Sequence, residues 1–100
     1  MEFLFNSKGK HIANIVNNQL HSPTGENIGH YILNDEIFID MRGRYLGEIF
    51  NNNRLVYNTH SSYRNVNYGS YGNYGNVGNY GNPGNYGSVS LYSGFRDIQL

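Results

Sequence analysis

A repeat of about 17 residues in the first half of the chain constrains the fold more than any other feature. Each unit has a short apolar segment, a polar turn ending in glycine, an apolar residue three positions later, and an Asn-rich turn that closes it. The units span residues 3–18, 20–35 and 37–52, and their polar turns end at Gly9, Gly25 and Gly43. A repeat of this kind sets the architecture of the chain before any single motif is considered.

The residues of each unit predict a β-hairpin. Asn, Asp and Gly tolerate the positive φ angles that tight hairpin turns require, and β-branched and aromatic residues fill the segments between them. Turn residues recur too often to leave room for stable helices. A small residue follows the apolar position at Ala13, Gly29 and Gly47. Because apolar residues three apart break strict alternation, we interpret this small residue as a bulge or kink in each strand.

A fourth unit is incomplete where it begins. Residues 55–58 start like the other units, but residues 59–67 lack the glycine and the apolar pair. The C-terminal segment from Gly94 to Ile98 has a spacing close to that of the missing half. Our hypothesis is that this segment completes the fourth unit, closes the array and covers an edge strand. The predicted fold is therefore an all-β array of hairpin repeats in a ring-like or pseudo-four-fold arrangement.

Glycine recurs at every third residue between Gly69 and Ser88. This period matches a polyproline-II-like extended segment with a glycine row, an asparagine row and a row of mostly tyrosine. Three interpretations follow: a flexible low-complexity tail, an extended segment packed on the body or on other copies, and a collagen-like trimer. Pro83 is the only proline of the tract, so collagen-like rigidity is missing. We divide the chain into a hairpin body (1–66), the Gly-Asn-Tyr tract (67–90) and a C-terminal strand packing back on the body (91–100).

Size and charge narrow the class of protein. A hairpin body of roughly 65 residues is marginally stable alone, and the chain has no cysteine that could crosslink it through a disulfide. We therefore expect a homo-oligomer. The formal net charge is zero and the seven Lys and Arg residues are scattered, so neither nucleic acid nor an anionic membrane is an expected partner. The start of the chain lacks the pattern of a secretory signal, and no apolar run approaches a membrane span, so we expect a cytoplasmic protein.

The repeated pattern G-x-x-[IL]-[AG]-x-[IY], followed by a tract of N-Y-G and G-N-Y triplets and a short apolar C-terminus, resembles the bacterial proteins called "4-fold beta flower". The resemblance covers nearly the whole chain. It implies an all-β assembly with four-fold or pseudo-four-fold arrangement, within one chain or among chains. It implies no activity.

Few residues suggest a catalytic or metal-binding site. The four histidines lack metal-ligand spacing, and no nucleophile elbow or phosphate-binding loop is present. Asn14, His30 and Glu48 occupy one repeat position, directly after the small residue. In a ring these three could converge into a small-ligand, metal or proton-transfer site. The other interpretation is that this position faces outward on each strand. We expect no enzyme activity and no cofactor.

The sequence favours a non-enzymatic structural or binding module that oligomerises or contacts a partner through a Tyr/Asn/Gly surface. Tyrosine offers a large contact area at low entropic cost, and asparagine offers adaptable hydrogen bonds. The alternative is a carbohydrate-binding module, because tyrosine rings stack on sugars and amides bind hydroxyl groups. Either a protein or a polysaccharide is then the partner. The predicted binding residues of the tract are Tyr71, Tyr74, Tyr80, Tyr86, Asn73, Asn79 and Asn85.

Overall fold

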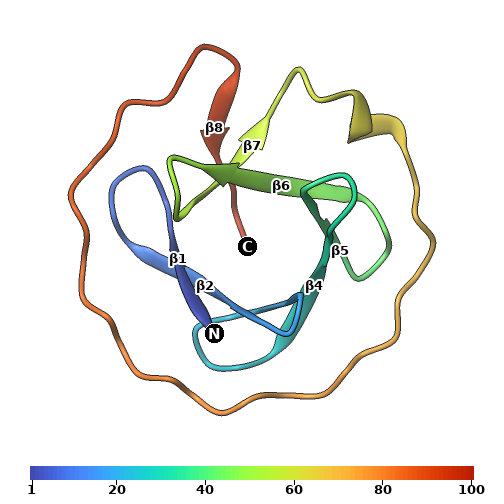
Figure 1. Cartoon of the computed structure of the whole chain (residues 1–100), viewed down its shortest axis with the longest axis horizontal. Coiled ribbons are helices and arrows are strands. Elements are labelled where there is room, and N and C mark those ends of the chain that lie inside the picture. The colour runs from blue at the N-terminus through green and yellow to red at the C-terminus, as the bar shows by residue number, and fades with distance from the viewer.

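The computed structural model describes all 100 residues and shows an all-β chain with one short 3-10 helix (Figure 1). The elements are β1 (Glu2–Phe5), β2 (His11–Val16), β3 (Gln19–His21), β4 (Asn27–Ile32), β5 (Ile37–Asp40), β6 (Tyr45–Phe50), β7 (Arg54–Asn58), the 3-10 helix η1 (Ser62–Asn65) and β8 (Phe95–Asp97). Each predicted repeat contributes one hairpin: β1–β2, β3–β4 and β5–β6. No helix is long and apolar enough to cross a membrane.

Seven of the strands close into a ring. Each strand pairs antiparallel with the next, and β1 also pairs with β7, in parallel, at Phe5 and Arg54. The Phe5 N–H donates to the Asn53 carbonyl across this junction, at 2.9 Å. The far end of β7 pairs instead with β8, where Val56 lies opposite Asp97. The C-terminal segment thus makes the fourth hairpin, and the predicted pseudo-four-fold, ring-like arrangement is confirmed within a single chain.

A bulge interrupts each of the first three hairpins at the same place. Leu4 pairs with Ala13, but the next residue, Phe5, pairs with His11, so Ile12 is an extra residue in β2. Ile28 in β4 and Leu46 in β6 are the corresponding extra residues. A bulge is therefore present in each unit as predicted, but the extra residue is the apolar one directly before the small residue, which is itself regularly paired. The bulge turns both Ile12 and Ile15 toward the core, although they are three positions apart.

Gly29 and Gly47 follow two of these bulges, and the neighbouring backbone explains their size. A Cβ atom at Gly29 would overlap the Ile39 carbonyl oxygen, and one at Gly47 would press on the Val56 carbonyl oxygen. The next strand therefore passes too close for a side chain, which is a usual reason for glycine inside a strand.

The core lies in the centre of the ring and is built from equivalent residues of the four hairpins. Leu4, Leu20, Phe38 and Leu55 are all buried there together with Ala13. Two sets of half-buried apolar residues extend this core along the strands: Ile12, Ile28, Leu46 and Ile98 in one, and Ile15, Tyr31 and Ile49 in the other. Full burial of one such side chain contributes roughly 1.5–3 kcal/mol, so a core with so few members is thin.

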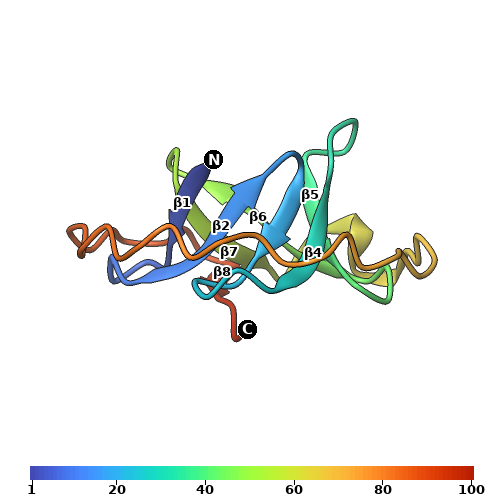
Figure 2. The same ribbon diagram turned by 90° about the horizontal axis from the view of Figure 1, so that it is seen from below.

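Residues 67–93, which we call the belt, circle the outside of the ring (Figures 1 and 2). The molecule is consequently a disc with extents of 35 × 35 × 21 Å. The N- and C-termini lie on its opposite faces (Figure 2). Of the three interpretations of the glycine tract, packing on the body is the one observed. The tract is extended as predicted, but Gly69, Gly75 and Gly81 have φ angles of 81–87°, so short extended pieces joined by turns replace one regular helix.

The belt is attached to the hairpin turns by backbone hydrogen bonds. The carbonyls of Gly43, Gly25 and Gly9 accept from the N–H groups of Tyr68, Val77 and Tyr86, at 2.8–2.9 Å. The fourth hairpin has an equivalent bond from Thr59 to Gly94 at 2.8 Å. The four donors lie nine residues apart in the sequence, which is three glycine triplets for each quarter of the ring. The triplet repeat therefore matches the circumference of the four-hairpin body.

Candidate functional site

The large side chains of the belt do not form the single row that the triplet period predicted. Alternate members are half-buried and exposed, and glycines with positive φ recur every sixth residue along the first part of the belt. The half-buried set is Tyr71, Val77, Pro83 and Val89. The exposed set, which we call the tyrosine rim, is Tyr74 (64% exposed), Tyr80 (45%), Tyr86 (51%) and Tyr92 (71%). Of the predicted tyrosines, Tyr71 thus belongs to the packing side and the other three to the rim, which also includes Tyr92.

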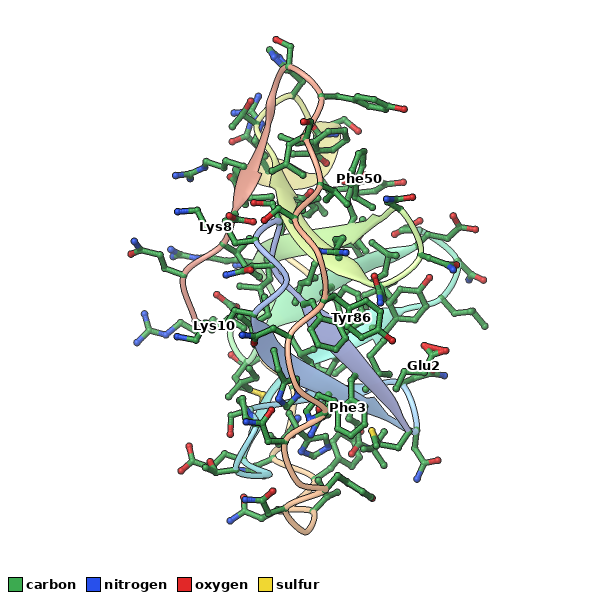
Figure 3. All side chains as sticks on the ribbon, turned by 90° about the vertical axis from the view of Figure 1, so that its left-hand side faces the viewer. Glu2, Phe3, Lys8, Lys10, Phe50 and Tyr86 are labelled. Carbon is green, nitrogen blue, oxygen red and sulfur yellow. The ribbon has the colours of Figure 1, made fainter.

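Three rim tyrosines are held by aromatic contacts with the ring of strands. The Tyr74 ring centroid lies 5.2 Å from that of His30, edge to face. Tyr86 lies 4.3 Å from Phe5, with the Arg54 guanidinium 5.8 Å from its ring centre. Tyr92 contacts Phe50 at 5.0 Å. Figure 3 shows Tyr86 where the belt crosses over β1, beside the hairpin that carries Lys10. These side chains are exposed yet fixed in place.

Asparagine side chains stabilise the turns of the belt. The Oδ1 atoms of Asn67, Asn73, Asn79 and Asn82 each accept the N–H of the glycine two residues later, at 2.7–2.8 Å. Such turns are a local preference of asparagine. Two of the predicted binding residues, Asn73 and Asn79, therefore use their carbonyl oxygen within the belt. Their amide NH₂ groups are what they can offer to a ligand.

The structure does not bring Asn14, His30 and Glu48 together. Asn14 Oδ1 lies 2.6 Å from His11 Nε2, and Glu48 Oε1 accepts the Tyr45 hydroxyl at 2.7 Å. His30 packs against the belt. Each of the three faces outward on its own strand, between Ala13-type and Ile15-type positions that face the core, so equivalent positions diverge around the ring. The convergence hypothesis is wrong, and no group of three or more His, Asp or Glu side chains could hold a metal.

Burial leaves several polar groups of β2, β3 and β4 without partners. Asn14 Nδ2, His21 Nε2 and His30 Nε2 are buried and make no hydrogen bond. Burial lowers the pKa of His30, the nearby His21 lowers it further, and the backbone of Gly72 on the belt opposes the shift. His30 is also stacked on Tyr71, with ring centroids 4.8 Å apart. The neutral imidazole is therefore part of how the belt packs in this quarter of the ring.

Two tyrosine hydroxyls bond to carboxylates. Burial, together with the hydrogen bond to Glu48, raises the pKa of Tyr45, whose hydroxyl also accepts the Asn58 N–H at 3.1 Å. Tyr68, near the start of the belt, donates to Asp35 in the β4–β5 turn. Burial and this hydrogen bond raise the pKa of Tyr68 to about 12. Both hydroxyls stay protonated at neutral pH and act as structural donors.

A polar cleft of about 370 Å³ opens between the belt and the first two hairpins. Its walls are Lys10, His11, Pro23 and Thr24 from the hairpins and Asn79, Gly81, Asn82 and Asn85 from the belt. Asn79 and Asn85 were predicted as binding residues, whereas Lys10, His11, Thr24 and Asn82 were not. No sequence signal identifies those four, because the path of the belt over the hairpins decides which residues meet.

Comparison with known proteins adds no relative: no family model, no curated protein and no solved structure matches this chain significantly. The resemblance to the 4-fold beta flower proteins therefore stays a prediction.

Proposed function

We propose that this protein is a non-enzymatic binding module that contacts its partner through the exposed tyrosines of the belt. The observation that carries the proposal is the tyrosine rim: four tyrosines, 45–71% exposed, at six-residue spacing around the disc. Exposed aromatic side chains at this density are unusual for a free surface and typical of contact surfaces. Because the belt is bonded to the hairpin turns, these side chains are ordered before binding, which lowers the entropic cost of association.

The chemistry of the belt indicates the kind of partner. No charged residue occurs between Arg64 and Arg96, so the rim has little electrostatic attraction for nucleic acid. Tyrosine and asparagine together suit an uncharged surface that offers hydroxyl and amide groups. A second copy of the chain and a polysaccharide both meet this description. The rim tyrosines keep 45–71% of their surface exposed although three of them contact the body, so the exposed parts of their rings are available for such a contact.

The proposed absence of catalysis follows from the uses of the candidate catalytic side chains. Glu48 accepts a bond from Tyr45, Asn14 is bonded to His11, and His30 packs under Tyr71 and Tyr74. Glu48 and Asn14 are thus bonded within their own strands, and His30 packs against the belt. The three side chains lie on three different strands and do not form one catalytic group of the kind that general acid–base chemistry requires.

Replacing the two most exposed rim tyrosines tests the proposal. The double variant Tyr74→Ser/Tyr92→Ser removes the outermost rings, and Leu33→Ser is the matched control, since Leu33 is 65% exposed but lies in the β4–β5 turn. Solution mass by size exclusion with light scattering reports self-association, and thermal stabilisation by polysaccharides reports glycan binding. We expect the wild type to show at least one of the two and the double variant to lose most of it. The proposal fails when the wild type shows neither, or when Leu33→Ser loses as much.

A further inference from the structure

The face of the disc that carries the C-terminus, which we call the C-terminal face, has an apolar centre (Figure 2). One half-buried apolar residue of each hairpin contributes to it: Ile12, Ile28, Leu46 and Ile98. Leu100 lies beside them and is 56% exposed. A groove of about 420 Å³ between the first and second hairpins includes Ile12, Ile28, Ile98 and Leu100 in its lining. These apolar side chains are therefore partly open to solvent.

Two opposite charges flank this groove at equivalent positions of neighbouring hairpins. Lys10 and Glu26 both line the groove, and each directly follows the glycine of its turn. The Lys10 N–H donates to Asn6 Oδ1 and the Glu26 N–H donates to Ser22 Oγ, so the two turns have the same form. Both side chains are exposed, and only the backbone groups of the two residues form hydrogen bonds. Figure 3 shows Lys10 on the side of the disc opposite Glu2.

A second copy of the chain can pair these charges. A two-fold axis that lies in the plane of the disc, between the first and second hairpins, exchanges the two positions. Copies stacked about this axis by their C-terminal faces bring Lys10 of one opposite Glu26 of the other, twice in each dimer. An axis through the first hairpin would instead oppose Lys10 to Lys10. Arg44, at the same position of the third hairpin, lines neither of the two grooves beside Ile98.

The size and composition of the face also suit such a contact. The disc is 35 Å across, so one face spans on the order of 1,000 Å², whereas a standard interface buries about 800 Å² on each partner. An apolar centre with charged residues at its edge is the usual anatomy of a protein interface. Stacking would also bury more apolar surface beside a thin core, which is a common way for small folds to gain stability.

We propose that the C-terminal face is the contact of a two-fold symmetric dimer of this chain. Ile12, Ile28 and Ile98 of the two copies pack together at its centre, and Lys10 of each copy pairs with Glu26 of the other. The tyrosine rim lies around the perimeter of the disc and stays exposed in this dimer. The inference goes beyond the proposed function, because it assigns a role to a different surface.

Charge reversal on one copy at a time tests the dimer. Sedimentation velocity over a concentration series measures the dimer dissociation constant of wild type, Lys10→Glu, Glu26→Lys and an equimolar mixture of the two variants. We expect wild type to dimerise and each variant to dimerise about ten-fold or more weakly, because like charges then face each other twice. The mixture should regain the dimer, since a mixed pair again opposes unlike charges. A folding defect could not produce this rescue.

Arg44→Glu is the matched control, because it makes the same change of charge at the equivalent position of the third hairpin. In the proposed dimer the third hairpin faces the fourth, where Phe95 follows the turn glycine, so no charge pair is lost. The dissociation constant should stay within about two-fold of wild type. The inference is overturned when wild type is monomeric, when the mixture does not regain the dimer, or when Arg44→Glu weakens the dimer as much as Lys10→Glu.

This dimer and the rim contact can fail separately. Self-association through the rim would add mass beyond the dimer, and Tyr74→Ser/Tyr92→Ser would remove only that addition. A monomeric wild type that is stabilised by a polysaccharide through the rim overturns the dimer and keeps the binding module. A dimer that responds to Lys10→Glu but shows no further association and no polysaccharide binding keeps the C-terminal face and overturns the binding module.

Discussion

The ring of strands and the belt are ordered by different interactions, although both follow the same four-fold plan. The ring has continuous strand pairing and a core in which Leu4, Leu20 and Phe38 are at most 1% exposed. The belt has no strand and is attached to each hairpin turn by one or two backbone hydrogen bonds, among them those to Gly9 and Gly25. The belt has no core of its own, but its hydrogen-bond donors recur at the same spacing as the hairpin turns of the ring. The ring can therefore hold the belt in one conformation. The belt is therefore ordered by its contacts with the ring and not by contacts within itself.

The largest expected effect on stability comes from creating a cavity in the core at the centre of the ring. Phe38→Ala removes a fully buried aromatic side chain and should lower the free energy of unfolding by about 3–5 kcal/mol. Denaturant titration followed by far-UV circular dichroism measures the loss. Leu33→Ala, at a position that is 65% exposed, is the control and should stay within about 0.5 kcal/mol of wild type. Equal effects of the two changes would contradict a core centred on the four equivalent residues.

A smaller effect is expected from breaking one attachment of the belt. Gly25 has φ of 100°, and a Cβ atom there would overlap the Val77 carbonyl oxygen. Gly25→Ala should therefore cost about 1–3 kcal/mol and release the belt locally. Hydrogen exchange at the Val77 amide, which donates to Gly25, should become faster.

Gly78→Ala is the matched control for this release, because no atom lies within 4 Å of a Cβ at Gly78 and its φ is not positive. It should leave the Val77 amide protected. If both substitutions accelerate exchange equally, the belt is not held at the hairpin glycine, and the contrast between ring and belt needs another explanation.

The smallest expected effect is a pH dependence of belt packing through His30. Burial lowers the pKa of His30 below its ordinary value of 6.5, so the unfolded chain binds this proton more readily than the folded chain. The stabilising contribution is therefore fully present above pH 6.5 and is lost as pH falls through the folded-state pKa. His30→Phe keeps a ring against Tyr71 and should flatten this part of the stability–pH curve. His60→Gln, at an exposed histidine, should leave the curve unchanged, and the same slope in wild type and His30→Phe would refute the role of His30.

Local patterns predicted the hairpins well because turns and strands depend on residues that are close in sequence. Gly9, Gly25 and Gly43 have the positive φ angles that their turns require, and the bulges fall beside Ala13, Gly29 and Gly47 as the spacing indicated. The fourth hairpin was harder, because its two strands, β7 and β8, are separated by the whole belt. The spacing from Gly94 to Ile98 still suggested it, since Ile98 packs against the core as the apolar residues of the other units do.

The candidate site was predicted less well than the fold. The triplet period identified the tyrosines and asparagines of the belt, but not that alternate large side chains are half-buried. Equivalent repeat positions suggested a cluster of Asn14, His30 and Glu48, and the ring separates them instead. Side chains that point outward from a closed ring diverge, so an equivalent position in each repeat implies proximity only for residues that face the core.

The sequence by itself determined the all-β class, the repeat, the turns and the extended character of the tract, because each depends on the φ preferences and side-chain alternation of neighbouring residues. Only the tertiary structure decided where the belt lies and which residues meet in the polar cleft. Lys10 and Asn82 face the same space because nine belt residues span each quarter of the ring, so that Val77 and Tyr86 reach Gly25 and Gly9. That match between the length of one segment and the circumference of another is a property of the folded ring.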